Sequence, residues 1–418
     1  MKYYSTRDKE RVNGLSASEA ILKGLAKDGG LFVPEKLPTI PQLSATLPYP
    51  EFGAKVLSPF FEGDVLQDKL LAICQSAFNF PLVLNKVSTF SVLELFHGPT
   101  AAFKDFGARF LACTMEALLK EMDKDLCILV ATSGDTGGAV ASAFHNREHL
   151  SVKVLFPKGR VAERQKKQLT VWGGNVESYE VSGSFDDCQR MVKEAFVDPS
   201  LKNLSSANSI NLGRLLPQMV YYVYTSVKHF EETGRKAHFI IPSGNVGNCT
   251  GAFWAKDMGA PIERITLSVN ANKTIPDYLT EGVYRPRSSV QTLANAMDVG
   301  SPSNMERLFN LYPSFDEFKS KVDAYSVSDD EIRETIKAVY EKDGYICCPH
   351  TATALKVYKD HYDGEDAIVV STAHPAKFET IVEPLIGKSV EIPQNLAALL
   401  KKESIYKEIS ADYHNLFN

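Results

Sequence analysis

The stretch HGPTAAFKDFG, residues 97–107, places one lysine, Lys104, directly after an expected strand and a Gly-Pro turn. The residues around this lysine are apolar: Ala101, Ala102, Phe103 and Phe106. A lysine in apolar surroundings loses the hydration of its ammonium group, so its pKa falls and the nucleophilic amine becomes more populated. Such an amine forms Schiff bases with aldehyde cofactors. A surface lysine in the first turn of a helix explains the stretch equally well, and only the rest of the chain distinguishes the two interpretations.

The composition is that of an ordinary globular protein. The chain has 418 residues, 44% hydrophobic and 23% charged, which is enough for two or three domains. The 46 basic and 51 acidic residues give a net charge of −5, so we expect no nucleic-acid or membrane partner. The polar N-terminus lacks the apolar core of a signal peptide. Seven cysteines without Cys-x-x-Cys or zinc-ligand spacing predict no metal site and free thiols in a reducing cytoplasm.

Strand and helix patterns alternate from residue 126 onward, which is typical of parallel α/β layers. The expected strands are 126–131, 152–156, 176–181, 239–241, 266–269 and 367–370. The expected helices are 105–122, 137–146, 160–172, 185–197 and 215–233. We therefore predict an α/β protein with open, mostly parallel sheets and flanking helices.

One Gly-rich loop between an expected strand and helix suits a phosphate group. In PSGNVGN, residues 242–248, Gly244 and Gly247 allow the backbone to turn its N–H groups toward one point. The N-terminus of the following helix adds a partial positive charge there. The loop lacks the Gly-Lys-Ser/Thr of a nucleotide P-loop. It predicts a phosphate-binding cradle, with a simple tight turn as the alternative.

Three further loops carry polar residues after expected strands. TSGDTGG, residues 132–138, suits a carboxylate, and Asp135 within it is either a polar contact to a cofactor hydroxyl or a helix N-cap. NSINLGR, residues 208–214, brings the fork of Arg214, which suits phosphate, although a solvated loop is the alternative. Thr372 follows the last buried strand, at the carboxyl end of the sheet where ligands of α/β proteins bind.

In combination, these motifs resemble pyridoxal-phosphate enzymes of the tryptophan-synthase-β fold type, and most closely the threonine synthase family. The resemblance covers nearly the whole chain, and the order of the motifs makes it specific. It is carried by YYSTR at 3–7, SEA at 18–20, DGGLFVPE at 28–35, HGPTAAFKDFG at 97–107, TSGDTGG at 132–138, NSINLGR at 208–214, PSGNVGN at 242–248 and STAHPAKF at 371–378.

The resemblance implies that Lys104 binds pyridoxal 5'-phosphate covalently, with Thr372 facing the pyridine nitrogen and Asp135 beside the ring hydroxyl. The residues implied for the cofactor phosphate are Gly244, Asn245, Val246, Gly247 and Asn248. Those implied for the substrate carboxylate are Thr132, Ser133 and Thr136. Those implied for the phosphate of O-phospho-L-homoserine are Asn208, Ser209 and Arg214, with Lys158 or Lys166 nearby. No role is implied for His350, and Asp105 either tunes Lys104 or caps its helix.

The resemblance also implies a fold type II enzyme whose active site lies in the cleft between a large and a small domain. We expect an N-terminal segment at 1–85 and a small substrate-binding domain at 126–214. The large cofactor-binding domain would comprise 86–125 and 215–418, with an inserted helical subdomain at about 271–340.

The implied reaction converts O-phospho-L-homoserine and water to L-threonine and phosphate by β,γ-elimination and replacement, the last step of threonine biosynthesis. A monomer or homodimer in the cytoplasm would carry it out. Alternatives are a phospho-lyase or threonine dehydratase of the same fold type, which release a 2-oxo acid, and a non-catalytic relative. A dehydratase would not need the phosphate loop around Arg214.

Overall fold

The structure is a computed structural model that describes residues 1–132 and 134–417. Within those residues the strands form a six-stranded sheet, a five-stranded sheet and a two-stranded N-terminal ribbon. The larger sheet has the order β11 (Asp323–Ser326), β10 (Ile262–Val269), β9 (Ala237–Pro242), β12 (Ile368–Ser371), β4 (Ser91–Glu94) and β3 (Val83–Lys86). The smaller sheet has the order β13 (Lys407–Ser410), β7 (Val176–Ser182), β6 (Leu150–Pro157), β5 (Leu126–Ala131) and β8 (Leu204–Ser206). The ribbon pairs β1 (Tyr3–Ser5) with β2 (Phe32–Pro34).

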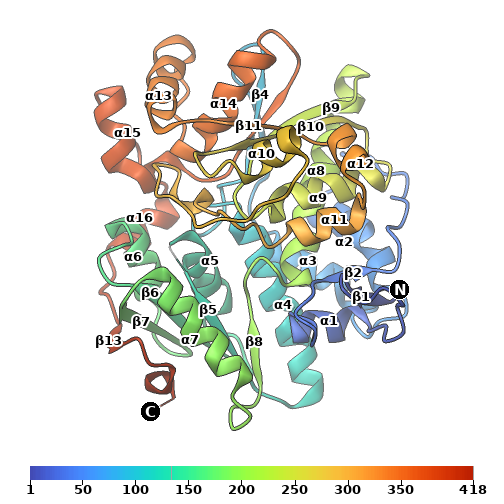
Figure 1. Ribbon diagram of the computed structural model, residues 1–418, viewed down its shortest axis with the longest axis vertical. Helices are drawn as coiled ribbons and strands as arrows, with labels where there is room; N and C mark the ends of the chain where they lie inside the picture. Colours follow the sequence, from blue (N-terminus) through green and yellow to red (C-terminus); the bar gives the residue numbers. More distant parts are fainter. Residues whose placement is uncertain (133, 418) are drawn as a thin grey trace.

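The pairing within the two main sheets is parallel except at the edge strand β3, which runs antiparallel to β4. Parallel sheets need helices on their faces, and the chain supplies them between successive strands. Figure 1 shows the sheets in different halves of the molecule, with α5, α6 and α7 beside the smaller sheet and α13, α14 and α15 in the other half. The expected α/β fold with open, mostly parallel sheets is confirmed.

The helices lie largely where the sequence pattern predicts them. They are α1 (Ala17–Lys23), α2 (Tyr49–Leu57), α3 (Leu70–Ala77), α4 (Lys104–Met122), α5 (Asp135–Phe144), α6 (Glu163–Thr170), α7 (Phe185–Val197), α8 (Leu212–Thr233), α9 (Gly247–Asp257), α10 (Thr274–Glu281), α11 (Met305–Leu311), α12 (Phe315–Lys321), α13 (Asp329–Asp343), α14 (Pro349–His361), α15 (Glu379–Ile386) and α16 (Gln394–Leu400). Short 3₁₀ turns join them, among them η3 (Asn295–Met297) and η4 (Pro375–Phe378). The segment 160–172 forms a shorter helix than expected.

The cap of α8 places a site residue. This helix begins three residues before the expected start because the side chain of Asn211 accepts the Gly213 N–H at 2.8 Å. Side-chain caps of this kind satisfy N–H groups that have no partner within the helix. Arg214 consequently lies in the first turn of α8, whose residues 212–223 are all buried and which packs against α4 and α9.

Two strands, β13 and β11, differ from the expected division of the chain: β13 from the assignment of all of 215–418 to the large domain, and β11 from the helical subdomain at 271–340. The C-terminal strand β13 pairs in parallel with β7, so it belongs to the smaller sheet. The chain returns there after α16, which packs on α6, and Lys167 Nζ donates to Lys402 O at 2.8 Å. Within 271–340, β11 pairs with β10 and extends the larger sheet. No described helix is both long and apolar enough to cross a membrane.

Candidate active site

Lys104 is the first residue of α4 and follows a tightly held turn. The Thr100 N–H and hydroxyl donate to the buried Asp105 carboxylate at 2.8 and 2.6 Å. Ala101 adopts a left-handed conformation with φ 54°, which is uncommon for a residue other than glycine. Burial raises the pKa of Asp105, whose contacts show that it holds the turn rather than capping α4. The turn therefore fixes the position of the Lys104 backbone, from which its side chain extends.

The loop after β12 supports Lys104 from the other side. The Phe103 N–H donates to Thr372 O at 2.8 Å, and the His374 N–H donates to Ala101 O at 3.0 Å. These antiparallel contacts place Thr372 directly beside the residue that precedes Lys104. Two motifs that are 268 positions apart therefore meet, as expected for one site.

The electrostatic surroundings of Lys104 favour its amine form. Burial, opposed by Asp135 and assisted by the positive charges of Lys377 and Arg214, lowers the pKa of Lys104 to about 8. The amine is then a substantial minority near neutral pH instead of a trace. These surroundings support the interpretation as a cofactor-binding lysine, while the half-buried Lys104 also lies in the first turn of a helix, as the alternative expects.

The loop between β9 and α9 is the one predicted to form an anion cradle. A Cβ added at Gly244 would lie 2.7 Å from Met297 Cα, so only glycine fits there without moving the backbone. The residue in the left-handed region is Val246, with φ 50°, and neither Gly244 nor Gly247 has a positive φ. The prediction that the two glycines make the turn is therefore wrong. Gly244 instead provides space, and the strain is carried by a β-branched residue, which is typical of functional sites.

The two asparagines of the cradle have different roles. Both ends of the Asn245 side-chain amide form hydrogen bonds: its Nδ2 donates to Ser209 Oγ at 2.6 Å, and its Oδ1 accepts the Ser303 N–H at 2.5 Å. Asn248 Oδ1 accepts hydroxyl protons from Tyr222, at 2.9 Å, and from Tyr221. Its Nδ2 is buried and has no partner in the described protein. A donor of this kind, beside the N-terminus of α9, is suited to an anion.

Arg214 is a buried cation whose guanidinium is only partly hydrogen-bonded within the described residues. Its Nη1 donates to Ala207 O at 2.5 Å, but its Nε is buried and has no partner among the described residues. Burial lowers its pKa to about 10, so it stays charged at neutral pH. Asn208 Oδ1 on the same loop is also buried and unpartnered within the described chain. The interpretation of 208–214 as a solvated loop is therefore wrong.

Two lysines expected near this loop lie elsewhere. Lys158 forms an ion pair with Glu408 at 2.5 Å and is half exposed. Lys166 pairs with Glu180 at 2.6 Å, and its Nζ lies 4.4 Å from the centroid of the Tyr406 ring. Both therefore connect α6 and the end of β6 with the strands β7 and β13.

The loop between β5 and α5 is organised by Thr132. Its Oγ1 accepts the N–H groups of Gly134 and Gly137 at 3.0 and 2.9 Å. Thr136 is half-buried, and Ser133 lies outside the described residues. Asp135 is not the N-cap, a position taken by Gly134.

The Asp135 carboxylate instead forms a buried ion pair with Lys377 at 2.8 Å and accepts Gln165 Nε2 at 3.1 Å. Although burial alone would raise the pKa of Asp135, the positive charges of Lys377 and Lys104 hold it well below the ordinary value.

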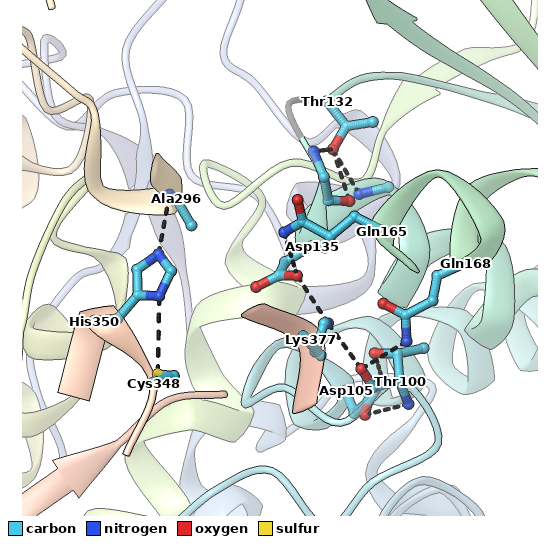
Figure 2. A network of polar contacts seen from close by, with 12 residues as sticks. Thr100, Asp105, Thr132, Asp135, Gln165, Gln168, Ala296, Cys348, His350 and Lys377 are labelled. Carbon is cyan, nitrogen blue, oxygen red and sulfur yellow. Dashed lines mark hydrogen bonds and ion pairs between the residues drawn. The ribbon is translucent and has the colours of Figure 1, made fainter. Parts of the chain in front are cut away.

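Sequence reasoning assigned no role to Lys377, Gln165, Gln168 and His350. Figure 2 shows Lys377 and the two glutamines around Asp135 and Thr100, and His350 apart from them, between Ala296 and Cys348. Lys377 Nζ and Gln168 Nε2 both donate to Thr100 O, at 2.8 and 2.9 Å. His350 Nε2 accepts the Ala296 N–H at 3.1 Å, and burial lowers the pKa of His350 to about 4, so the ring is neutral. One signal was available for Lys377: it stands between Ala376 and Phe378, as Lys104 stands in an apolar stretch.

Several buried polar atoms on these elements have no partner within the described residues. They are Gln165 Oε1, Asn208 Oδ1, Arg214 Nε, Gln218 Oε1, Asn248 Nδ2 and Asn295 Oδ1. Buried polar groups are nearly always paired, so the unpartnered donors Arg214 Nε and Asn248 Nδ2 suit a ligand. An amine for an aldehyde and a cradle for a phosphate fit pyridoxal phosphate. The guanidinium of Arg214, with its unpartnered Nε, belongs to another loop and suits a second anion.

Comparison with known proteins leads to the same chemistry. Residues 83–372 match the family of pyridoxal-phosphate dependent enzymes, and residues 2–78 and 351–416 match the N-terminal and C-terminal regions of threonine synthases. The chain is 40% identical over 423 residues to threonine synthase of Haemophilus influenzae, covering 100% of this chain and 98% of that protein.

Solved structures of threonine synthases are similar over the full length. The enzyme of Escherichia coli is 37% identical with a TM-score of 0.90, covering 100% of this chain and 98% of that one. The pyridoxal-phosphate-bound enzyme of Brucella melitensis is 33% identical with a TM-score of 0.92 and the same coverage. This chain belongs to the threonine synthase family of pyridoxal-phosphate dependent enzymes.

Proposed function

We propose that this protein converts O-phospho-L-homoserine and water to L-threonine and phosphate. The observation that carries the proposal is the convergence of a half-buried lysine amine with two separate groups of anion donors. The first group contains the unpartnered Asn248 Nδ2 of the loop at 244–248, and the second is the guanidinium of Arg214, whose Nε has no partner among the described residues. A substrate that carries its own phosphate, in addition to that of the cofactor, requires two such groups.

The cradle would hold the cofactor phosphate through the backbone of Gly244, Val246 and Gly247 and through Asn248 Nδ2. Asn245 would support it indirectly, since its amide already binds Ser209 and Ser303. Thr372 would face the pyridine nitrogen, where a neutral hydroxyl leaves that nitrogen largely unprotonated. The Asp135 carboxylate would lie beside the ring hydroxyl.

When bound, pyridoxal 5'-phosphate supplies an electron sink that stabilises negative charge at the α carbon of the substrate. Lys104 Nζ, once released by the substrate, would accept the α proton and, after giving that proton up, a β proton, because its pKa lies close to neutral pH. Arg214, with Asn208 and Ser209, would bind the substrate phosphate and stabilise the charge that grows on it as it leaves.

The substrate carboxylate would be received by the loop at 132–136. The Thr132 hydroxyl is bound within that loop, so we assign it to shaping the backbone and Thr136 to direct contact. Ser133, which would contribute there as well, lies outside the described residues.

We propose a small domain of residues 126–214 joined by β13, and a large domain of 86–125 with the rest of 215–418, preceded by the segment 1–85. The pairing of β13 with β7 supports this revision. The seven free thiols support a reducing compartment such as the cytoplasm. One chain supplies all of these site residues, which fits a monomer as well as a homodimer.

The test combines spectroscopy with phosphate release. The purified protein, titrated with pyridoxal 5'-phosphate, should develop the visible absorption band of a Schiff base and should then release inorganic phosphate from O-phospho-L-homoserine. The Lys104→Ala variant should do neither. A wild-type protein that stays colourless with added cofactor would refute the proposed site.

A further inference from the structure

Lys377 is a second lysine of this site and is almost completely buried, with 1% of its surface exposed. Its ammonium group contacts Asp135 Oδ1 and Thr100 O, each at 2.8 Å. Figure 2 shows it between the carboxylate and the turn. One side chain thus ties the loop after β12 to the first residue of α5 and to the turn that precedes Lys104.

Asp135 has two ammonium groups within its electrostatic reach. Its negative charge acts on Lys104, but its carboxylate oxygen is bound by Lys377 and Gln165. The other ionisable groups that act on Lys104 or Asp135 come from α8 and α14. Arg214 is a cation, and His350 is neutral at physiological pH. Lys377 is therefore the direct ion-pair partner of the one carboxylate that favours a protonated Lys104.

We propose that Lys377 is a positioning residue: by binding Asp135, it withholds that carboxylate from Lys104 and leaves the Lys104 amine available to the aldehyde cofactor. The inference rests on the proposed function, since it takes Lys104 as the cofactor-binding group. In that step Lys104 Nζ forms a C=N bond with the aldehyde carbon, and the aldehyde oxygen leaves as water. Only the unprotonated amine attacks, so the charge on Lys104 controls the rate.

The Lys377–Asp135 ion pair determines the direction in which each substitution should shift the pKa of Lys104. Without the Lys377 charge, buried Asp135 has Lys104 as its remaining ammonium neighbour, and an opposite charge nearby favours the protonated lysine. Lys377→Met should therefore raise the pKa of Lys104 and slow cofactor association at neutral pH. Asp135→Asn should have the opposite effect. The double variant removes both charges and should return Lys104 close to its wild-type behaviour.

The experiment measures the rate constant of pyridoxal 5'-phosphate association with cofactor-free protein between pH 6 and 10, followed by the absorption of the Schiff base. For Lys377→Met we expect the midpoint of this profile to rise by about one unit, so that association at pH 7 is about tenfold slower. Asp135→Asn should lower the midpoint. Lys153→Met is the matched control, because Lys153 is also largely buried and pairs with Glu177 at 2.6 Å; its profile should equal that of the wild type.

Distinct outcomes separate this inference from the proposed function. An unchanged midpoint in folded Lys377→Met overturns the inference while leaving the cofactor site intact. If that variant does not fold, Asp135→Asn decides, and a midpoint that does not fall overturns the inference. Borohydride reduction and peptide mass spectrometry should locate the cofactor on Lys104; attachment to Lys377 would overturn the positioning role of Lys377. A wild-type protein that forms no Schiff base refutes the proposed function itself.

Discussion

Replacing Arg214 should weaken substrate binding while leaving the cofactor in place. Its guanidinium is buried, its Nη1 donates to Ala207 O, and its Nε has no partner among the described residues. Charge-assisted hydrogen bonds contribute ~1.5–3 kcal/mol each. Loss of one such contact to the substrate phosphate in Arg214→Met should therefore weaken binding by about 10- to 150-fold. The Schiff-base absorption should persist, because Lys104 and the cradle at 244–248 are unchanged.

The same substitution should have little effect on stability. No carboxylate of the described residues forms an ion pair with Arg214, and replacing a buried charge by an apolar side chain of similar volume is often neutral. The lost bond to Ala207 O costs ~1 kcal/mol.

Arg307→Met is the informative contrast. Arg307 is equally buried, but its guanidinium binds Phe32 O, Ile210 O and Asn304 Oδ1, at 3.0, 2.7 and 2.7 Å. Loss of these hydrogen bonds in Arg307→Met should lower the free energy of unfolding by about 3 kcal/mol or more.

Two measurements check the prediction. Titration of the cofactor-loaded protein with O-phospho-L-homoserine gives the dissociation constant, and urea unfolding gives the stability of both variants. An Arg214→Met protein that binds substrate as tightly as the wild type would show that the substrate phosphate lies elsewhere. A loss of stability as large as that of Arg307→Met would show that Arg214 is structural.

Three further substitutions test other parts of the site. Burial lowers the pKa of His350 to about 4, from about 6.5 in an unfolded chain. The stability that the neutral ring contributes is therefore complete above pH 6.5 and is lost as the pH falls toward 4. In urea unfolding, the His350→Gln variant should consequently lose less stability than the wild type between pH 7 and 4.5. Gly244→Ala brings a Cβ within 2.7 Å of Met297 Cα, and the resulting backbone shift should weaken cofactor binding at least about tenfold in a fluorescence titration, the effect of one lost charge-assisted bond. Tyr222→Phe removes the 2.9 Å bond to Asn248 Oδ1 and should cost ~1 kcal/mol of stability in thermal unfolding, with a smaller loss of cofactor affinity than Gly244→Ala.

The sequence predicted the parts of this structure that depend on local pattern. Strand β5 has the expected bounds, and α7 begins after Ser184, which forms a capping box with Asp187. The anion loops could be found because glycines and small polar residues between a strand and a helix have a local signature. The late strand β13 was not predicted, since its partner β7 lies more than 200 residues earlier in the chain.

The connections between the loops could not be predicted, because they depend on side chains that meet only in the folded chain. Lys377 and Asp135 are 242 positions apart, and no property of either motif indicates their ion pair. The space that requires glycine at 244 is set by Met297 on another loop. The sequence allows Asp105 to be a helix cap or a neighbour that tunes Lys104, and only the folded structure shows that it binds Thr100.

The identity of the product tests the proposed function most directly. Cofactor-loaded protein is incubated with O-phospho-L-homoserine in ¹⁸O-labelled water, and the products are identified by mass spectrometry. The proposed function predicts L-threonine with one heavy oxygen in its hydroxyl group, formed in a one-to-one ratio with inorganic phosphate. Phosphate released together with 2-oxobutanoate as the main product would contradict it and identify a phospho-lyase instead.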